Sequence, residues 1–205
     1  PPGFGTSERP DWISSVDDIS YIYLDLIEKL GIKKAPVLGF SFGGWLAAEI
    51  ATKNDAFVSK LVLVAPSGIK VGGPLDRDIA DFWSLHPSEV LKRKWHNVEK
   101  GKRDFPSMPE EKLTIVARNV ESLARFCWDR YMHNPKLKRR LHRTTSPPRV
   151  SWGVQDGSVT PAYGKSHSAH LPRTTRPATP ASAARPPYEP PASPRRAGPP
   201  HTSPP

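Results

Sequence analysis

The strongest constraint on the fold is a short motif, Gly39-Phe40-Ser41-Phe42-Gly43, set between two kinds of hydrophobic pattern. A short apolar run, residues 35–39, precedes it, and apolar residues at helical spacing follow it (Trp45, Leu46, Ala47, Ile50 and Ala51). This order predicts a strand, a sharp turn and a helix. A G-x-S-x-G sequence in that setting is typical of a strained turn that lifts the serine hydroxyl clear of a sheet.

The residue types in this motif suit nucleophilic catalysis. Side chains larger than hydrogen at Gly39 and Gly43 are expected to collide with neighbouring backbone. The turn would place the backbone N–H of Phe42 at a helix N-terminus, where it can stabilise an oxyanion. We therefore predict Ser41 as a nucleophile and the Phe42 N–H as an oxyanion donor. The alternative is a glycine-rich turn whose serine caps the helix.

The elements around the motif predict an α/β domain. Apolar residues between 19 and 30 recur at spacings of three and one, which indicates an amphipathic helix. Ser15 and Asp18 form a possible capping box at its start, and Gly31 is expected to end it. Residues 60–65 form a near-continuous apolar run, as in a parallel strand covered on both faces. Alternating helices and strands of this kind favour an α/β fold.

Residues 69–146 change character and predict a helical cap. Helical pieces are expected over 79–83, 87–95, 110–126 and 134–142, with no convincing strand between them. The apolar side chains of this region form either cap core or the wall of a substrate pocket (Phe82, Trp83, Leu91, Trp95, Phe126 and Trp128). A weak strand is predicted over 149–153, followed by Asp156 and Gly157 in a loop. We divide the chain into core (1–68), cap (69–146), core (147–165) and tail (166–205).

The tail is defined by its proline content. Residues 171–205 hold 12 of the 25 prolines, five arginines and one acidic residue. Such a segment cannot bury enough apolar surface to offset its ordering entropy, so we predict that it is disordered. A shifted reading frame in GC-rich coding sequence would produce this abrupt change. Translating the same DNA in its other two frames tests that hypothesis.

Charge and cysteine content exclude several classes of protein. Four units of the net charge of +10 lie in the tail, so the rest is only moderately basic, which argues against a dedicated nucleic-acid binder. The run 136–140 could still bind an acidic partner, but Leu137 and Leu141 favour a helix with a solvated basic face. A single cysteine, Cys127, excludes a disulfide framework. With no apolar run long enough to span a bilayer, we expect a cytoplasmic protein.

The motif and its neighbours together resemble the α/β-hydrolase superfamily. The resemblance covers about residues 2–165 and includes the segment 2–7, the serine turn, the strand ending in Ala65-Pro66-Ser67-Gly68, the cap, and Trp152-Gly153-Val154-Gln155-Asp156. It is strongest for esterases and carbon–carbon bond hydrolases with helical lids. It implies a partial α/β-hydrolase fold, with a mostly parallel sheet, flanking helices, a helical cap and a disordered C-terminal tail.

The resemblance also implies a catalytic triad, of which one member is missing. Asp156 occupies the position of the triad acid, where it would orient a histidine; the alternative is an ordinary turn residue in an Asp-Gly turn. The family's histidine usually stands in a Gly-His step, which this chain lacks. His167 and His170 follow Asp156 too closely for the intervening helix and strand, and His201 has no strand before it. We therefore interpret each of them as a solvated side chain.

The chain also resembles a protein truncated at its front. It lacks an initiating Met, and the loop that supplies the family's second oxyanion N–H would precede residue 1, which would leave a sheet edge exposed. We expect a serine hydrolase acting on esters or similar carbonyl substrates, or an inactive fragment that acts by binding. A small-molecule substrate is expected, with no cofactor, metal, nucleic acid or membrane partner. The sequence sets no oligomeric state.

Overall fold

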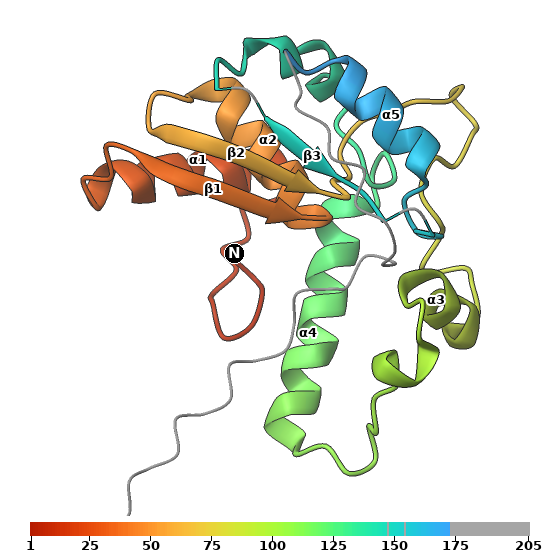
Figure 1. Cartoon of the computed structure of the whole chain (residues 1–205). Coiled ribbons are helices and arrows are strands. Elements are labelled where there is room, and N and C mark those ends of the chain that lie inside the picture. The colour runs from red at the N-terminus through yellow and green to blue at the C-terminus, as the bar shows by residue number, and fades with distance from the viewer. Residues whose placement is uncertain (147, 154, 173–205) are drawn as a thin grey trace, which may run out of the picture.

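The computed structural model describes residues 1–146, 148–153 and 155–172. In these residues, parallel strands form one sheet in the order β1 (Ala35–Phe40), β2 (Val58–Val64) and β3 (Arg149–Ser151) (Figure 1). The helices are α1 (Val16–Lys29), α2 (Phe42–Lys53), α3 (Pro87–Lys94), α4 (Glu110–Cys127) and α5 (Pro161–Ala169), with 3₁₀ turns η1 (Val98–Gly101), η2 (Leu137–Arg139) and η3 (Leu141–Arg143). The parallel sheet with flanking helices confirms the α/β prediction.

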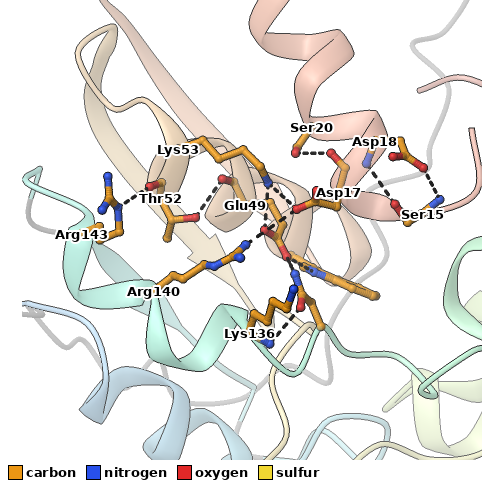
Figure 2. Close-up of polar contacts among 12 residues, drawn as sticks. Ser15, Asp17, Asp18, Ser20, Glu49, Thr52, Lys53, Lys136, Arg140 and Arg143 are labelled. Carbon is orange, nitrogen blue, oxygen red and sulfur yellow. Dashed lines mark hydrogen bonds and ion pairs between the residues drawn. The ribbon is translucent and has the colours of Figure 1, made fainter.

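Helix α1 begins at its predicted capping box. The Asp18 N–H donates to Ser15 Oγ at 3.1 Å, and the Ser15 N–H donates to Asp18 Oδ2 at 2.9 Å (Figure 2). Past the end of the helix, Gly31 has a φ of +64°, the left-handed conformation that glycine adopts without strain. The buried Val16 and Ile19 belong to the main core, and α1 packs against α2.

Strand β2 is the central strand of the described sheet. Its Leu61 and Leu63 are buried, and Leu63 lies in register with Gly39, whose missing side chain would point at α2. The opposite face is more open, because Lys60 is exposed and Leu38 is 58% exposed. In the described residues β2 is therefore covered on one face, whereas the sequence predicted cover on both faces. Strand β1 is an edge strand of this sheet, as expected.

The region predicted as a cap contains two of its expected helices and lacks a third. Helices α3 and α4 lie where the periodicity placed them, and α4 extends away from the sheet (Figure 1). The helix expected over 79–83 is wrong, because Ile79 instead forms an antiparallel bridge with Val159. Backbone pairing with a distant loop thus overrides the local apolar pattern there. The helix expected over 134–142 is two short 3₁₀ turns, η2 and η3, and η3 packs against α2.

The first residues of the predicted tail are ordered into the fold. Helix α5 runs through Ala169, and His167, Ser168 and Leu171 are buried. The tail prediction is therefore wrong for residues 166–172, whose apolar contacts come from a helix that begins earlier, at Pro161. Residues 173–205, on which the rest of that prediction falls, lie outside the described part of the chain. Within the described part, the helices are all too short or too polar to cross a membrane.

Candidate active site

Ser41 stands on a strained turn between β1 and α2. Its φ of 47° and ψ of −116° lie in a region that side-chain-bearing residues rarely adopt, at a cost on the order of 1–3 kcal/mol. Backbone hydrogen bonds hold the turn: the Ser41 N–H donates to Val64 O at 2.9 Å, and Ser41 O accepts from Ser67 N at 3.2 Å. The serine residue is exposed. The surrounding backbone therefore holds a strained serine at the surface.

The serine does not cap the helix that follows it. Helix α2 begins at Phe42, and the Ser41 side chain makes no capping hydrogen bond. The alternative interpretation of the motif as a helix-capping turn is therefore wrong. Because the first N–H groups of a helix have no intrahelical partner, the Phe42 N–H lies where a developing negative charge would be stabilised.

The glycines around Ser41 differ in how much space they have. A Cβ at Gly39 would lie 2.3 Å from Gly43 O, so only glycine fits there, as predicted. The expectation for Gly43 is wrong, because a Cβ there would have no atom within 4 Å. The second close approach is at Gly44, where a Cβ would lie 2.8 Å from Pro66 Cβ. Pro66 lies just after β2 and outside the serine motif, so the motif by itself does not predict this close approach.

Asp156 lies in the loop after β3 and uses one carboxylate oxygen in a local turn. Its Oδ1 accepts hydrogen bonds from the N–H groups of Ser158 at 2.8 Å and Val159 at 2.9 Å. Its Oδ2 is buried and has no hydrogen-bond partner in the described residues. Burial raises the pKa of Asp156 above its ordinary value, while the two N–H donors lower it. Oδ1 thus has the role expected of a turn residue, whereas Oδ2 remains available to accept a hydrogen bond.

The loop that carries Asp156 is held from three sides. Ser158 Oγ donates to Arg93 O of α3 at 3.2 Å, and the Ala80 N–H donates to Ser158 O at 3.0 Å. The Trp152 indole N–H donates to Val159 O at 2.6 Å. The first two contacts join the loop after β3 to residues of the predicted cap, and the third lies within the segment after β3. Sequence reasoning missed the contacts with Arg93 and Ala80 because each pairs residues that are far apart in the chain.

The histidines near Asp156 are not placed as a catalytic base. His167 is fully buried, so the prediction of a solvated side chain is wrong for it. Neither ring nitrogen of His167 has a hydrogen-bond partner in the described residues, and burial lowers its pKa to about 4. His170 is half-buried, and its Nδ1 lies 2.8 Å from Ser166 O. His201 lies outside the described residues.

An aromatic contact links the serine turn to the long helix α4. The Phe4 ring lies 5.4 Å from the Phe42 ring and 6.1 Å from the Phe126 ring, measured between centroids. Phe126 is buried, whereas Trp128 is 62% exposed and contacts Trp83 at 5.8 Å. Of the predicted cap side chains, Phe126 is therefore the one that this contact chain brings toward Phe42.

Metal-binding clusters and the cysteine thiol are two further features of the described residues. They contain no group of three or more His, Cys, Asp or Glu side chains placed to hold a metal ion. Cys127 is buried, and burial raises the pKa of its thiol to about 12, so it is not a ready nucleophile.

Residues 1–92 match a family model described as the alpha/beta hydrolase fold. Over 83 residues the chain is 36% identical to the 1-acylglycerol-3-phosphate O-acyltransferase ABHD5 of Homo sapiens, an alignment that covers 38% of this chain and 23% of that relative. Over 93 residues it is 31% identical to a 2-hydroxymuconate semialdehyde hydrolase of Pseudomonas, covering 45% of this chain and 32% of the relative. The chain thus matches less than a third of the length of either relative.

A solved structure extends the likeness beyond the matched segment. The meta-cleavage product hydrolase of Pseudomonas fluorescens superposes with a TM-score of 0.63 and 18% identity, over 84% of this chain and 66% of that one. At this identity the likeness concerns the arrangement of the elements alone.

Proposed function

Because this chain has the α/β-hydrolase fold, as its motifs indicated, we propose that it is a serine-type hydrolase acting on esters or similar carbonyl compounds. The observation that carries the proposal is the backbone of Ser41. Ser41 is exposed, has a strained φ of 47° and makes no helix cap, so neither burial nor capping of the helix explains its conformation. Strained backbone of this kind is held in place by the surrounding structure and is concentrated at active sites.

The proposed chemistry begins at the Ser41 hydroxyl. Its oxygen attacks the substrate carbonyl carbon while a base takes the hydroxyl proton, since a neutral serine is a weak nucleophile. The carbonyl oxygen then becomes an oxyanion, which accepts a hydrogen bond from the Phe42 N–H. Collapse of this intermediate expels the leaving group, which takes up the proton, and leaves an acyl group on Ser41. Water releases the acyl group by the same steps.

Asp156 is proposed as the group that orients the base. Its unpartnered Oδ2 is a buried acceptor, and such an atom loses free energy unless a donor reaches it. A ring N–H of a histidine is the donor that this chemistry needs, because an imidazole held by Asp156 can accept the Ser41 proton on its other nitrogen. In the described residues no histidine occupies that place.

The proposed substrate carries an acyl or similar carbonyl group. One relative is by name an acyltransferase and the other a hydrolase of a semialdehyde, and both names imply a reacting carbonyl compound. The rings of Phe4 and Phe42 lie beside the serine turn and favour an apolar group next to that carbonyl. The single buried cysteine fits a reducing compartment such as the cytoplasm.

A second function, binding without turnover, is favoured by a different observation. No histidine in the described residues forms a hydrogen bond with Asp156 or Ser41. Loss of the histidine costs on the order of a millionfold in kcat in a serine protease, which leaves the catalysis of binding and oxyanion stabilisation. A chain in this state would hold a carbonyl ligand without releasing products at a useful rate.

A fluorophosphonate probe separates the two functions. The probe should label the full chain, labelling should disappear in Ser41→Ala, and it should persist in Ser7→Ala, a matched change at another exposed serine. Asp156→Asn should slow labelling if Asp156 acts through the base. Circular dichroism establishes that each variant is folded. Failure of the folded wild-type chain to label would contradict the nucleophile role of Ser41 and leave binding as the function.

A further inference from the structure

The turns η2 and η3 present a row of cations on a buried support. Residues 136–143 contain five lysines and arginines and no carboxylate. Leu137 and Leu141 of this segment are fully buried, so both anchor it to the core. Lys136 is exposed just before the first anchor, whereas Arg139, which is exposed, and Arg140, which is half-buried, lie between the two anchors. The basic face expected from the sequence therefore exists, on 3₁₀ turns in place of a helix.

Hydrogen bonds tie this segment to helix α2 at both ends. The Lys136 N–H donates to Asn134 Oδ1 at 2.9 Å, and Asn134 Nδ2 donates to the fully buried Glu49 at 2.7 Å. At the other end, Arg143 Nε donates to Thr52 O at 3.1 Å (Figure 2). The cations are thus presented by fixed backbone, so a ligand has to order only their side chains and not the segment that carries them.

The carboxylates nearby are largely used by another cation. Lys53 Nζ lies 3.1 Å from Glu49 Oε2 and 2.8 Å from Asp17 Oδ1. Arg140 reaches the same Asp17 oxygen only at 3.9 Å (Figure 2). In the described part of the chain, Lys136 and Arg139 form no ion pair. Positive charge therefore exceeds negative charge at this surface.

These cations surround a single hollow. It is a depression open to solvent, with a volume of about 510 Å³, and it is lined by Pro135, Lys136, Arg139 and Arg140. Like charges gathered around one concavity repel one another, and an anion placed there relieves the repulsion. Guanidinium groups are suited to the oxygens of a phosphate, which they can bind in pairs.

We propose that the hollow bounded by Lys136, Arg139 and Arg140 is a binding site for a phosphate monoester group. The hollow is distinct from Ser41, so this site does not depend on the proposed hydrolase activity. A phosphate monoester carries nearly two negative charges at neutral pH, which matches a site with two unpaired cations and a third held by a long ion pair.

The lining of the hollow argues against a nucleic acid. Single-stranded nucleic acids are held by aromatic side chains on which bases stack, together with cations. The four lining residues include no aromatic side chain. A phosphate monoester needs only the cations. Its source is either a free metabolite or the headgroup of a lipid, and both present the same group to the hollow.

Calorimetric titration of the full chain with inorganic phosphate and with glycerol 3-phosphate, at constant ionic strength, tests the proposal. Saturable binding is expected, with affinity about tenfold weaker in the double variant Lys136→Gln/Arg139→Gln, which removes the two charges. The matched control is Lys33→Gln/Lys34→Gln, which removes the same charge from exposed lysines outside the hollow. Circular dichroism confirms that both variants are folded.

Co-sedimentation with lipid vesicles distinguishes the two sources of phosphate. Binding to vesicles of phosphatidic acid that the hollow variant loses identifies a lipid monoester. Binding to the free compounds alone identifies a metabolite. Equal binding to phosphatidylglycerol vesicles, whose phosphate is a diester, would overturn the proposal in favour of general attraction to anionic membranes. Equal phosphate affinity in the hollow variant and the control, or hollow-dependent binding of single-stranded RNA without phosphate binding, would also overturn it.

Discussion

Acid should destabilise this protein through His167. The ring is fully buried without hydrogen-bond partners, and its pKa falls from 6.5 to about 4 because burial disfavours the charged form. The unfolded chain therefore binds a proton between these two pH values that the folded chain does not. The stability from the neutral ring is present above pH 6.5 and is lost as the pH falls from 6.5 toward 4.

The size of this effect follows from the shift. Linkage gives a loss of about 2 kcal/mol in the free energy of unfolding between pH 7 and pH 5, and about 3 kcal/mol when the pH reaches 4. Urea denaturation at each pH measures it. His167→Leu removes the titrating group at nearly constant volume. The free energy of unfolding of the wild type minus that of this variant should therefore fall by the same amount between pH 7 and pH 5.

Other groups titrate over the same range, and the comparison between variants removes them. His142→Leu makes the same replacement at an exposed histidine and shows how far the change from histidine to leucine by itself alters stability. A wild-type minus His167→Leu difference that stays constant from pH 7 to pH 5 would refute the reasoning. An NMR titration in which the His167 ring protonates near pH 6.5 would refute it as well, because the ring would then be hydrated.

Two further predictions concern the serine turn and the cysteine. Gly39→Ala should destabilise the fold by about 2 kcal/mol or more, because its Cβ would meet Gly43 O at 2.3 Å, whereas Gly43→Ala should cost less than about 1 kcal/mol; equal effects in urea denaturation would contradict the geometry of the turn. Cys127, buried and with a thiol pKa raised to about 12, should resist iodoacetamide at pH 8 and react in urea. Mass spectrometry measures the modification, and rapid alkylation of the native chain would show that the thiol is exposed.

Much of the local structure could be predicted from the sequence because its causes are local. The capping box depends on Ser15 and Asp18, which are three residues apart, and α1 begins where this pair predicts. The order of strand, turn and helix around Ser41 follows from hydrophobic spacing over fewer than 20 residues. The weak strand near Val150 is also confirmed, over a shorter range than expected.

Two of the failures share one cause, which is packing against segments that are distant in the sequence. The helix expected over 79–83 is replaced by pairing of Ile79 with Val159, and the sequence near Ile79 holds no sign of that partner. The ordered residues 166–172 have few apolar side chains, but helix α5 carries them into the core. The composition of a segment gives only its own apolar surface area, whereas its packing depends also on the apolar surface of the residues that it contacts.

By itself, the sequence determined the α/β class, the strained turn and the identity of the serine on it, because these depend on neighbouring residues and on the freedom of Gly39. Only the tertiary structure decided that the second close approach is at Gly44, that Asp156 keeps one buried oxygen free and that His167 is buried without a partner. Each of these depends on how closely separate segments pack. The distances between these segments are set when the helices and loops pack around the sheet, and no local sequence pattern determines them.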